Sequence, residues 1–369
     1  MIYCPRGIYF LKSVDASDIV KDATNLCSLF SEIVEWVRPE NIVQLVTDNA
    51  ANYKKAGELL QARFNNIYWS PCAAHCLNLI LKDLGSMHLI EDLAKKASKV
   101  TIFAYNHVYV LAWLRKRQGW KEIVRPRATW FATTFIPLKI VCEHKHDLQA
   151  LITSKFYAYS KIAKTCKGKE AAVIILDLKF CNDCLTISKI AGPLIMLLRI
   201  VDSDEKPSLG YLYDGMYRAR KAIKAMFRNV KRLYKLFTSI VKRRWDTQLR
   251  QGIHAAAYFL NPQFQYDKEE WWKMFGSSAP NLQKVAIRIL SQTLSSSGCE
   301  RNWSIFEQIH SKRRNHLEHQ RLNNLVYVRY NLNLKDRYNY LFLNAMSQSI
   351  HCMFVEMSLK LLLHFLGFN

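Results

Sequence analysis

Residues 42–84 read IVQLVTDNAANYKKAGELLQARFNNIYWSPCAAHCLNLILKDL, and this stretch decides the fold class. The apolar run Ile42–Val46 is typical of a buried strand, and residues 50–64 suit a helix. A second short strand is expected at Ile67–Trp69. Strand and helix therefore alternate, which predicts an α/β layer with at least one parallel strand pair.

The same alternation extends in both directions along the chain. Ile8–Val14 indicates an earlier strand that begins only after Pro5-Arg6-Gly7, and Ser17–Val37 indicates the helix that follows it. Downstream, Ser70-Pro71 supplies a helix N-cap and a favoured first helical position, so a helix is expected over Cys72–Leu84.

The length and charge of the chain limit its possible size class and partners. With 369 residues, half of them hydrophobic, the chain is long enough for a sizeable core and two or three substructures. Its 53 Lys and Arg against 30 Asp and Glu give a net charge of +23. Such an excess favours a polyanionic partner, most often nucleic acid, and says nothing about fold. A basic surface that binds nothing is the alternative.

Cysteine usage and the chain ends point to an intracellular protein without a membrane partner. The ten cysteines form no dense framework and no secretory signal precedes them, which predicts reduced thiols. The apolar stretch Cys352–Phe368 contains Glu356, Lys360 and His364, so it is too short and too charged for a membrane span.

Two basic regions are candidates for DNA contact. Residues 86–275 are expected to be mostly helical, and between Arg218 and Arg250 they carry twelve Lys and Arg with Asp246 as the only acid. In the other region, Trp113 and Trp120 are interleaved with basic residues, a pattern that can bind phosphates and stack bases. A solvated helix face and an ordinary exposed loop are the respective alternatives. The candidate residues are Arg115, Arg117, Arg125, Arg127, Lys231, Arg232, Arg243 and Arg244.

Two acids stand in positions that suggest chemistry. Asp48 follows a buried strand, at the end where open α/β sheets place functional groups, although capping of the next helix explains it equally well. Glu300 lies in SSSGCERNWSIF (residues 295–306) and opens a helix with an apolar face, so it either caps that helix or faces something specific. Phosphodiester chemistry by two metal ions needs several such carboxylates converging from distant parts of a chain.

Cys72 and His75 lie one helical turn apart and suggest zinc. A structural zinc site needs four ligands, and neither Cys181/Cys184 nor His144/His146 is tied to this pair by spacing. Packing of a helix N-terminus, with His75 as a polar contact near the site, is therefore preferred. The sequence also lacks a phosphate-binding Gly-rich loop, a Gly-x-Ser-x-Gly elbow and a His-Glu-x-x-His motif.

Three segments together resemble plant hAT-superfamily transposases. They read VTDNAANY at residues 46–53, WSPCAAHCLN at 69–78 and SGCERNWSIF at 297–306, in this order and at large spacings. The resemblance extends from residue 1 to about residue 335 and implies a ribonuclease-H-like catalytic fold interrupted by an all-helical insertion. In that family two Asp and one Glu hold divalent metal ions for DNA cleavage and strand transfer.

The resemblance assigns roles to particular residues. Asp48 matches the second Asp and Glu300 matches the Glu, while Cys72 and His75 match a Cys-x-x-His motif near the site. The helices after Glu300 match the region that completes the core and supports dimers. The dimerisation residues it implies are Trp303, Phe306, Leu322, Leu325, Val326 and Val328.

The family's first Asp has no match, because it lies on a strand ahead of the point where this sequence begins, and neither Asp15 nor Asp18 corresponds to it. The amino-terminal zinc finger of the family has no match either. The expectation is a truncated, catalytically inactive, nuclear protein that needs no cofactor, forms a homodimer or pairs with a related hAT-like protein, and binds DNA non-specifically. The alternatives are an active nuclease using Mg²⁺ or Mn²⁺ with Asp15 or Asp18 as its third acid, and a host-adopted DNA-binding regulator.

The expected fold class is α/β with a large all-α portion. Its predicted parts are an incomplete ribonuclease-H-like core over residues 1–85, a helical insertion over 86–275, a dimerisation region completing the core over 276–335, and a tail without a recognised counterpart over 336–369.

Overall fold

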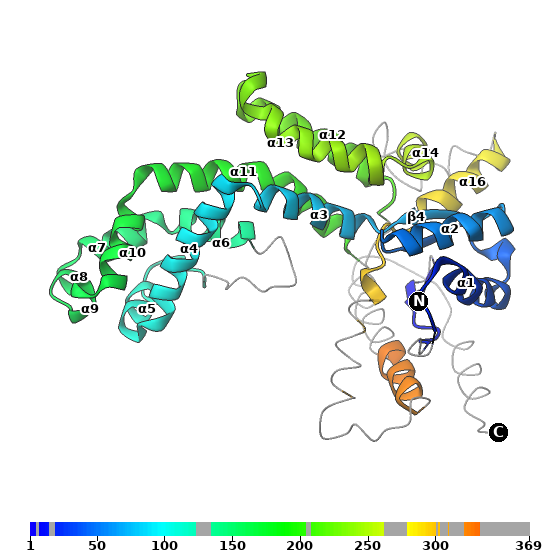
Figure 1. Ribbon diagram of the computed structural model, residues 1–369, viewed down its shortest axis with the longest axis horizontal. Helices are drawn as coiled ribbons and strands as arrows, with labels where there is room; N and C mark the ends of the chain where they lie inside the picture. Colours follow the sequence, from blue (N-terminus) through cyan, green and yellow to red (C-terminus); the bar gives the residue numbers. More distant parts are fainter. Residues whose placement is uncertain are drawn as a thin grey trace, which may run out of the picture. The chain divides into compact units, whose positions relative to one another are not determined.

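A computed structural model describes residues 1–4, 7–14, 19–122, 134–203, 208–261, 279–299, 302, 309 and 321–332. The chain divides into two compact units (Figure 1). The larger unit is Ala16–Gly298, and the smaller unit joins the first 15 residues to the part of the chain that follows Gly298.

The α/β part of the larger unit is built on one pair of strands. β3 (Gln44–Thr47) and β4 (Tyr68–Pro71) run parallel, with Gln44 opposite Tyr68 and Thr47 opposite Pro71. The crossover between them contains helix α2 (Ala51–Arg63), which packs on both strands and on α1 (Ala23–Val37). The predicted parallel pair is thereby confirmed, and the mostly helical structure is consistent with a mixed α/β class.

The helix predicted from Ser17 to Val37 begins later than expected. Asp22 is the N-cap of α1, and its carboxylate accepts a hydrogen bond from the Asn25 N–H at 2.8 Å. Such a cap satisfies one of the otherwise unpaired amides of the first turn, so the helix begins at Ala23. At its other end a short 3₁₀ turn, η1 (Pro39–Asn41), leads toward β3.

The predicted N-cap at Ser70 is wrong. Ser70 and Pro71 belong to β4, and the hydroxyl of Ser70 accepts a hydrogen bond from the Gln44 side chain at 2.6 Å. The Cys72 N–H continues the strand pairing by donating to the Thr47 carbonyl at 2.7 Å. Helix α3 (Ala73–Gly85) therefore starts with Cys72 as its N-cap.

The remainder of the larger unit is helical (Figure 1). Its helices are α4 (His88–Asn106), α5 (Val108–Arg115), α6 (Phe135–Glu143), α7 (Lys145–Thr153), α8 (Lys155–Ala158), α9 (Lys161–Lys164), α10 (Cys166–Leu176), α11 (Leu178–Val201), α12 (Tyr211–Met226), α13 (Lys231–Arg244), the π-helix η3 (Trp245–Leu249), α14 (Gly252–Leu260) and α16 (Pro280–Leu290).

Helix α11 is the central helix of this helical part. It packs against α3, α6 and α12, and it buries side chains along its whole length from Phe180 to Val201. Among the described residues, it is the one helix long and apolar enough to cross a membrane by length and composition. Core helices of folded domains meet the same test, and the packing of α11 is that of a core helix.

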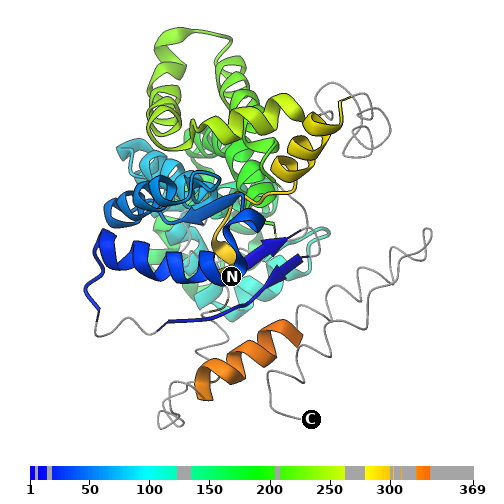
Figure 2. The same cartoon turned by 90° about the vertical axis from the view of Figure 1, so that its right-hand side faces the viewer.

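The smaller unit has its own apolar cluster. Strands β1 (Ile2–Cys4) and β2 (Gly7–Tyr9) form an antiparallel pair, visible in Figure 2. Ile8 and Phe10 pack with Ile309 and with a helix over residues 321–332. The strand predicted at Ile8–Val14 is thus shorter than expected and is paired with an unanticipated strand before it.

Candidate functional site

Asp48 and Cys72 occupy equivalent places on neighbouring strands. Asp48 is the residue directly after β3, Cys72 is the residue directly after β4, and the strand ends Thr47 and Pro71 face each other in the parallel register. Both residues therefore stand at the carboxyl edge of the strand pair, which is the usual location of functional groups in open α/β sheets. The predicted position of Asp48, directly after a strand, is confirmed.

The position of Asp48 is fixed by a buried aromatic side chain. The indole N–H of Trp69 donates to the hydroxyl of Thr47 at 2.9 Å, and Thr47 is itself buried. The Trp69 ring lies so close to Gly57 on α2 that a Cβ at this glycine would overlap it. A glycine in the crossover helix thus allows the ring to hold the strand end that carries Asp48.

Asp48 does not cap helix α2, so the capping interpretation is wrong. The N-cap of α2 is Ala50, and no side chain accepts a hydrogen bond there. Asp48 is half-buried, and among the residues that the structure describes its carboxylate has no hydrogen-bond or ion-pair partner. A carboxylate placed at this edge without a structural partner is available to a ligand.

The segment that leads toward Glu300 docks at the same edge. The Leu294 carbonyl accepts the N–H of Ala73 at 2.9 Å, and the Ser296 N–H donates to the Cys72 sulfur at 3.3 Å. The Cys72 sulfur also accepts the His75 N–H at 3.5 Å. Residues 294–296 therefore close the amino end of α3, and Cys72 is the link between the strand pair and this segment. Glu300 itself lies outside the described residues.

Asp202 is a neighbour of this segment that the sequence did not reveal. It follows the last residue of α11, and one of its carboxylate oxygens accepts a hydrogen bond from the Ser295 hydroxyl at 3.5 Å. That hydroxyl also lies 2.6 Å from the hydroxyl of Ser297. The available signal was an acid at the end of a long apolar helix, which alone does not identify a site.

The spacing of Cys72 and His75 suggested zinc. No group of three or more His, Cys, Asp or Glu side chains that could hold a metal ion occurs within the described ranges. The backbone N–H of His75, not its ring, contacts Cys72. Burial raises the pKa of the Cys76 thiol, and the neighbouring Cys72 and Asp48 raise it further while Arg244 lowers it. Burial therefore favours the protonated form of the Cys76 thiol.

Two of the predicted DNA-contacting arginines take part in a structural ion-pair network. Arg244 donates two hydrogen bonds to the carboxylate of Asp83 on α3, at 2.8 and 3.0 Å, and Arg243 donates a third at 3.0 Å. These bonds hold the pKa of Asp83 below its ordinary range. The geometry gives Arg243 and Arg244 the role of fastening α13 to α3.

The arginines of α5 and of the turn that follows it also have local partners. Arg115 pairs with Glu122 at 2.7 Å, and the guanidinium of Arg117 lies 3.9 Å from the centre of the Trp113 ring. Arg125 and Arg127 lie outside the described residues. The structure thus shows Trp113 covered by Arg117.

Lys231 and Arg232 differ from the other candidates, because they are exposed at the start of α13 and have no ion pair among the described residues. Helices α12 and α13 pack against each other and form a hairpin, in whose turn Arg228 and Asn229 adopt positive φ angles of 50° and 61°. Phe227 stacks on Phe237 with ring centres 5.6 Å apart, which fixes the two helices to each other.

The predicted dimerisation residues fall on two different faces of the helix over residues 321–332. Leu322 and Val326 are buried in the apolar cluster of the smaller unit. Leu325 is 44% exposed and Val328 is half-buried. Within the described part of the predicted set, Leu325 and Val328 are therefore the side chains that remain open to a partner. Trp303 and Phe306 lie outside the described residues.

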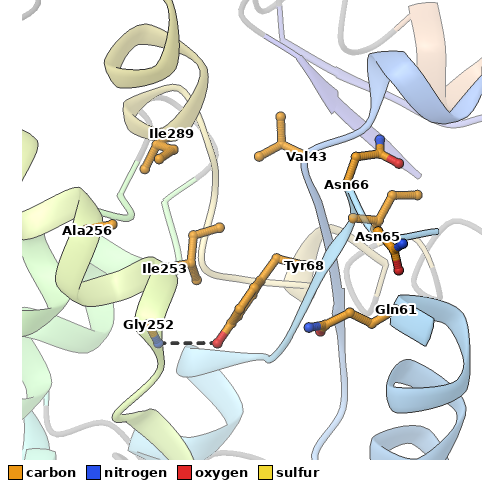
Figure 3. Close-up of a pocket in the computed structure, with 10 residues that line it drawn as sticks. Val43, Gln61, Asn65, Asn66, Tyr68, Gly252, Ile253, Ala256 and Ile289 are labelled. Carbon is orange, nitrogen blue, oxygen red and sulfur yellow. Dashed lines mark hydrogen bonds between the residues drawn. The ribbon is translucent and has the colours of Figure 1, made fainter. Parts of the chain in front are cut away.

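A cavity of about 300 Å³ lies at the opposite end of the strand pair (Figure 3). The Tyr68 ring crosses it, and the Tyr68 hydroxyl accepts the N–H of Gly252 at 3.2 Å. Gln61 accepts the Trp69 N–H and Asn66 donates to the Pro39 carbonyl, so these side chains serve the fold. Because functional groups gather at the carboxyl edge, this cavity is separate from the candidate site.

Comparison with known families gives two matches. Residues 1–100 match the model of a domain of unknown function (DUF659), and residues 258–332 match the hAT family C-terminal dimerisation region. No curated protein matches the chain. The first match contains Asp48, Cys72 and His75, and the second contains Glu300 and the helix over residues 321–332. Together the two matches support an hAT-family, transposase-like protein.

Proposed function

We propose that this chain is a transposase-derived protein that self-associates through the helix over residues 321–332 and binds DNA through the α12–α13 hairpin. The match to a dimerisation region supports self-association, with a second copy or a related hAT-like protein as the partner. A nuclear location is part of the proposal, because DNA is there.

The observation that carries the proposal is the division of this helix into a covered and an uncovered face. Leu322, Val326 and Tyr330 are buried inside the smaller unit. Leu325, Val328 and Leu332 are spaced by three and four residues, so they share a face, and Leu325 and Leu332 are 44% and 48% exposed. Each leucine is already more than half buried, so burying the rest of it in a partner would contribute about 1 kcal/mol, roughly half the value for a fully exposed leucine.

Sedimentation of the full chain at micromolar concentration tests self-association. We expect a dimer for the native chain and a monomer for the double variant Leu325→Asp/Leu332→Asp, with unchanged circular dichroism. The double variant Leu89→Asp/Leu176→Asp is a matched control, because these leucines are 51% and 47% exposed on α4 and α10. A native chain that sediments as a monomer, or a dimer that survives the first pair of substitutions, would overturn this interface.

The DNA-binding part of the proposal rests on unpaired charge at the hairpin. Lys221, Arg228, Lys231, Arg232 and Lys235 are exposed and have no ion pair among the described residues. Contacts of this kind bind phosphates without regard to sequence, and affinity then falls with salt by a log–log slope of about −0.9 per phosphate neutralised.

Fluorescence anisotropy with a 20-base-pair duplex tests the hairpin. The variant Lys231→Gln/Arg232→Gln/Lys235→Gln should bind more weakly and reduce the magnitude of the salt slope by roughly 1–3. The control variant Lys21→Gln/Lys189→Gln/Lys284→Gln removes the same charge from scattered exposed positions and should leave the slope close to that of the native chain. Equal slopes for the native chain and the hairpin variant would exclude the hairpin as the contact.

We further propose that the chain has lost the metal-dependent DNA cleavage of such transposases. Two-metal chemistry needs several converging carboxylates, and the described residues provide Asp48 at the edge without a metal-binding group around it. Glu300, the other acid matched to the metal ligands, lies outside the described residues, so no cleavage step is assigned to this edge. Nicking of a duplex that depends on Mn²⁺ and is abolished by Glu300→Gln would show an active nuclease instead.

A further inference from the structure

Seven exposed lysine and aromatic side chains lie within residues 155–169, on α8, α9, α10 and their connections, a region that the basic pattern of the sequence did not single out. We call it the lysine–aromatic surface. Tyr159 is 84% exposed and Phe156 is 45% exposed, although large aromatic side chains are usually buried. The surface consists of Lys155, Phe156, Tyr159, Lys161, Lys164, Lys167 and Lys169.

The charge of this surface is unbalanced. No Asp or Glu occurs between Asp147 and Glu170, and Glu170 pairs with Lys99 on α4 at 2.6 Å. None of the five lysines has an ion pair among the described residues. The surface therefore carries five positive charges for which the described part of the chain supplies no paired carboxylate.

The backbone beneath the surface is held rigidly. Ser154, Ser160 and Thr165 each cap one of the three successive helices, accepting backbone N–H bonds at 3.2, 3.2 and 3.0 Å. The buried Tyr157 donates its hydroxyl to the Gly168 carbonyl at 2.8 Å, which ties α8 to α10. Gly168 in turn approaches the Ile162 carbonyl so closely that a Cβ would overlap it.

The hydrogen-bonded backbone also holds the two exposed aromatic side chains in place. Phe156 and Tyr159 flank the buried Tyr157, which packs edge-on against Phe103 at a ring distance of 6.2 Å. The two exposed rings are therefore presented from a fixed backbone. Preorganised contact surfaces lose less entropy on binding than mobile ones.

We infer that the lysine–aromatic surface binds single-stranded nucleic acid, with its lysines on the phosphates and Tyr159 and Phe156 stacked on bases. The five unpaired lysines complement a polyanion. The exposed rings select among polyanions, because bases in a duplex are stacked on one another whereas single-stranded bases are free to stack on aromatic side chains. The inference does not rest on the proposed function, because it uses neither the hairpin nor the dimerisation helix.

Anisotropy titration of the full chain with fluorescent dT20 tests the inference. Tyr159→Ala should weaken binding by about tenfold, because one stacked base is lost, while Tyr159→Phe should bind like the native chain. Lys161→Gln/Lys164→Gln/Lys167→Gln should reduce the magnitude of the salt slope by about 2, at about 0.7 per phosphate of a single strand. The control Lys21→Gln/Lys189→Gln/Lys284→Gln should leave that slope almost unchanged.

An abasic 20-mer separates stacking from charge. It retains every phosphate but has no base, so Tyr159→Ala should bind it as well as the native chain does, while the lysine variant should still bind it more weakly. A parallel titration with rU20 shows whether RNA or DNA is preferred, and both belong to the chemistry inferred here.

Three results would overturn the inference. The first is that neither the tyrosine variant nor the lysine variant changes the affinity for dT20. The second is that Tyr159→Ala loses as much affinity for the abasic strand as for dT20. The third is that poly-glutamate displaces dT20 at the same charge concentration as unlabelled dT20 does. The last result would identify an acidic protein segment as the occupant. All substituted side chains are exposed, and circular dichroism of each variant shows that the helices are intact.

Discussion

The side-chain amide of Asn331 forms two hydrogen bonds with the backbone of Phe10. Its oxygen accepts the Phe10 N–H at 3.0 Å, and its nitrogen donates to the Phe10 carbonyl at 3.0 Å. The amide thus pairs with the chain just beyond β2 as a neighbouring strand would. It connects the amino-terminal hairpin to the helix of the dimerisation region.

Replacement of Asn331 by alanine should destabilise the smaller unit by about 1–3 kcal/mol, because two partly buried backbone groups lose their partner. Hydrogen exchange should become faster over residues 2–10, and urea unfolding should show the loss of free energy. Asn65→Ala is the matched control, since Asn65 is exposed and has no hydrogen-bond partner among the described residues. Unchanged exchange in Asn331→Ala would show that the pairing is not maintained in solution.

Gly57→Ala should destabilise the strand pair, because the added Cβ overlaps the Trp69 ring. Overpacking of this kind costs about 1–3 kcal/mol, and displacement of the indole should change the tryptophan fluorescence. Gly192→Ala is the opposite case, since nothing lies within 4 Å of its Cβ position on α11. That variant should be neutral or more stable by up to about 1 kcal/mol. Equal stability of the two variants would contradict the packing described for Trp69.

These two contacts show what the sequence could and could not predict. The order of β3, α2, β4 and α3 follows from local apolar patterns, so it was predictable within a few residues. The N-cap of α3 was not, because Ser70-Pro71 is a strong local signal that the pairing of β4 with β3 overrides. Gly57 gave no local sign of its role, since its reason is a ring twelve residues away on another element.

The locations of the candidate sites could be predicted from the sequence, but the residues that take part in them were harder to predict. Asp48 and Cys72 stand at the same edge because parallel strands end on one side of a sheet. The alternation of strands and helices in the sequence predicts this parallel topology. Leu322 and Leu325 look alike in sequence, and only the packing of Ile8 and Phe10 decides which of them is buried. The partner of Arg244 could not be predicted either, because Asp83 lies 161 residues earlier in the chain.

Asp83→Asn should lower stability by about 1 kcal/mol at neutral pH, since three charge-assisted hydrogen bonds at a partly exposed position are weakened. Arg244 lowers the pKa of Asp83 below its ordinary value of 3.8 in the folded state. The carboxylate therefore contributes its full stability above about pH 5, and the contribution is lost as pH falls below 3.8 toward the folded-state pKa. In thermal melts of both proteins between about pH 2.5 and 7, the difference in stability should become smaller as pH falls below 3.8. A constant difference across that range would exclude the ion pair as its source.

Cys72→Ala should loosen the segment that precedes Glu300, because the sulfur accepts the N–H groups of Ser296 and His75. The expected loss is about 1–3 kcal/mol, together with faster amide exchange at Ser296. Cys72→Ser supplies a hydroxyl acceptor at the same N-cap and should restore most of the protection. If the alanine and serine variants exchange equally fast, the sulfur acts by volume and not as an acceptor.

His254 should make the stability of the larger unit depend on pH between about 6.5 and 4. Its ring is completely buried, its Nδ1–H donates to the Leu249 carbonyl at 2.7 Å, and burial lowers its pKa from 6.5 to about 4. The unfolded chain therefore takes up a proton first as pH falls, so stability is complete above pH 6.5 and decreases toward pH 4, by roughly 3 kcal/mol in all. His254→Gln cannot titrate, and its urea unfolding free energy should lack this part of the pH dependence. His88→Gln, at a position whose side chain is 91% exposed, should keep it. Parallel pH profiles for the native chain and His254→Gln would show that the buried ring is not the titrating group.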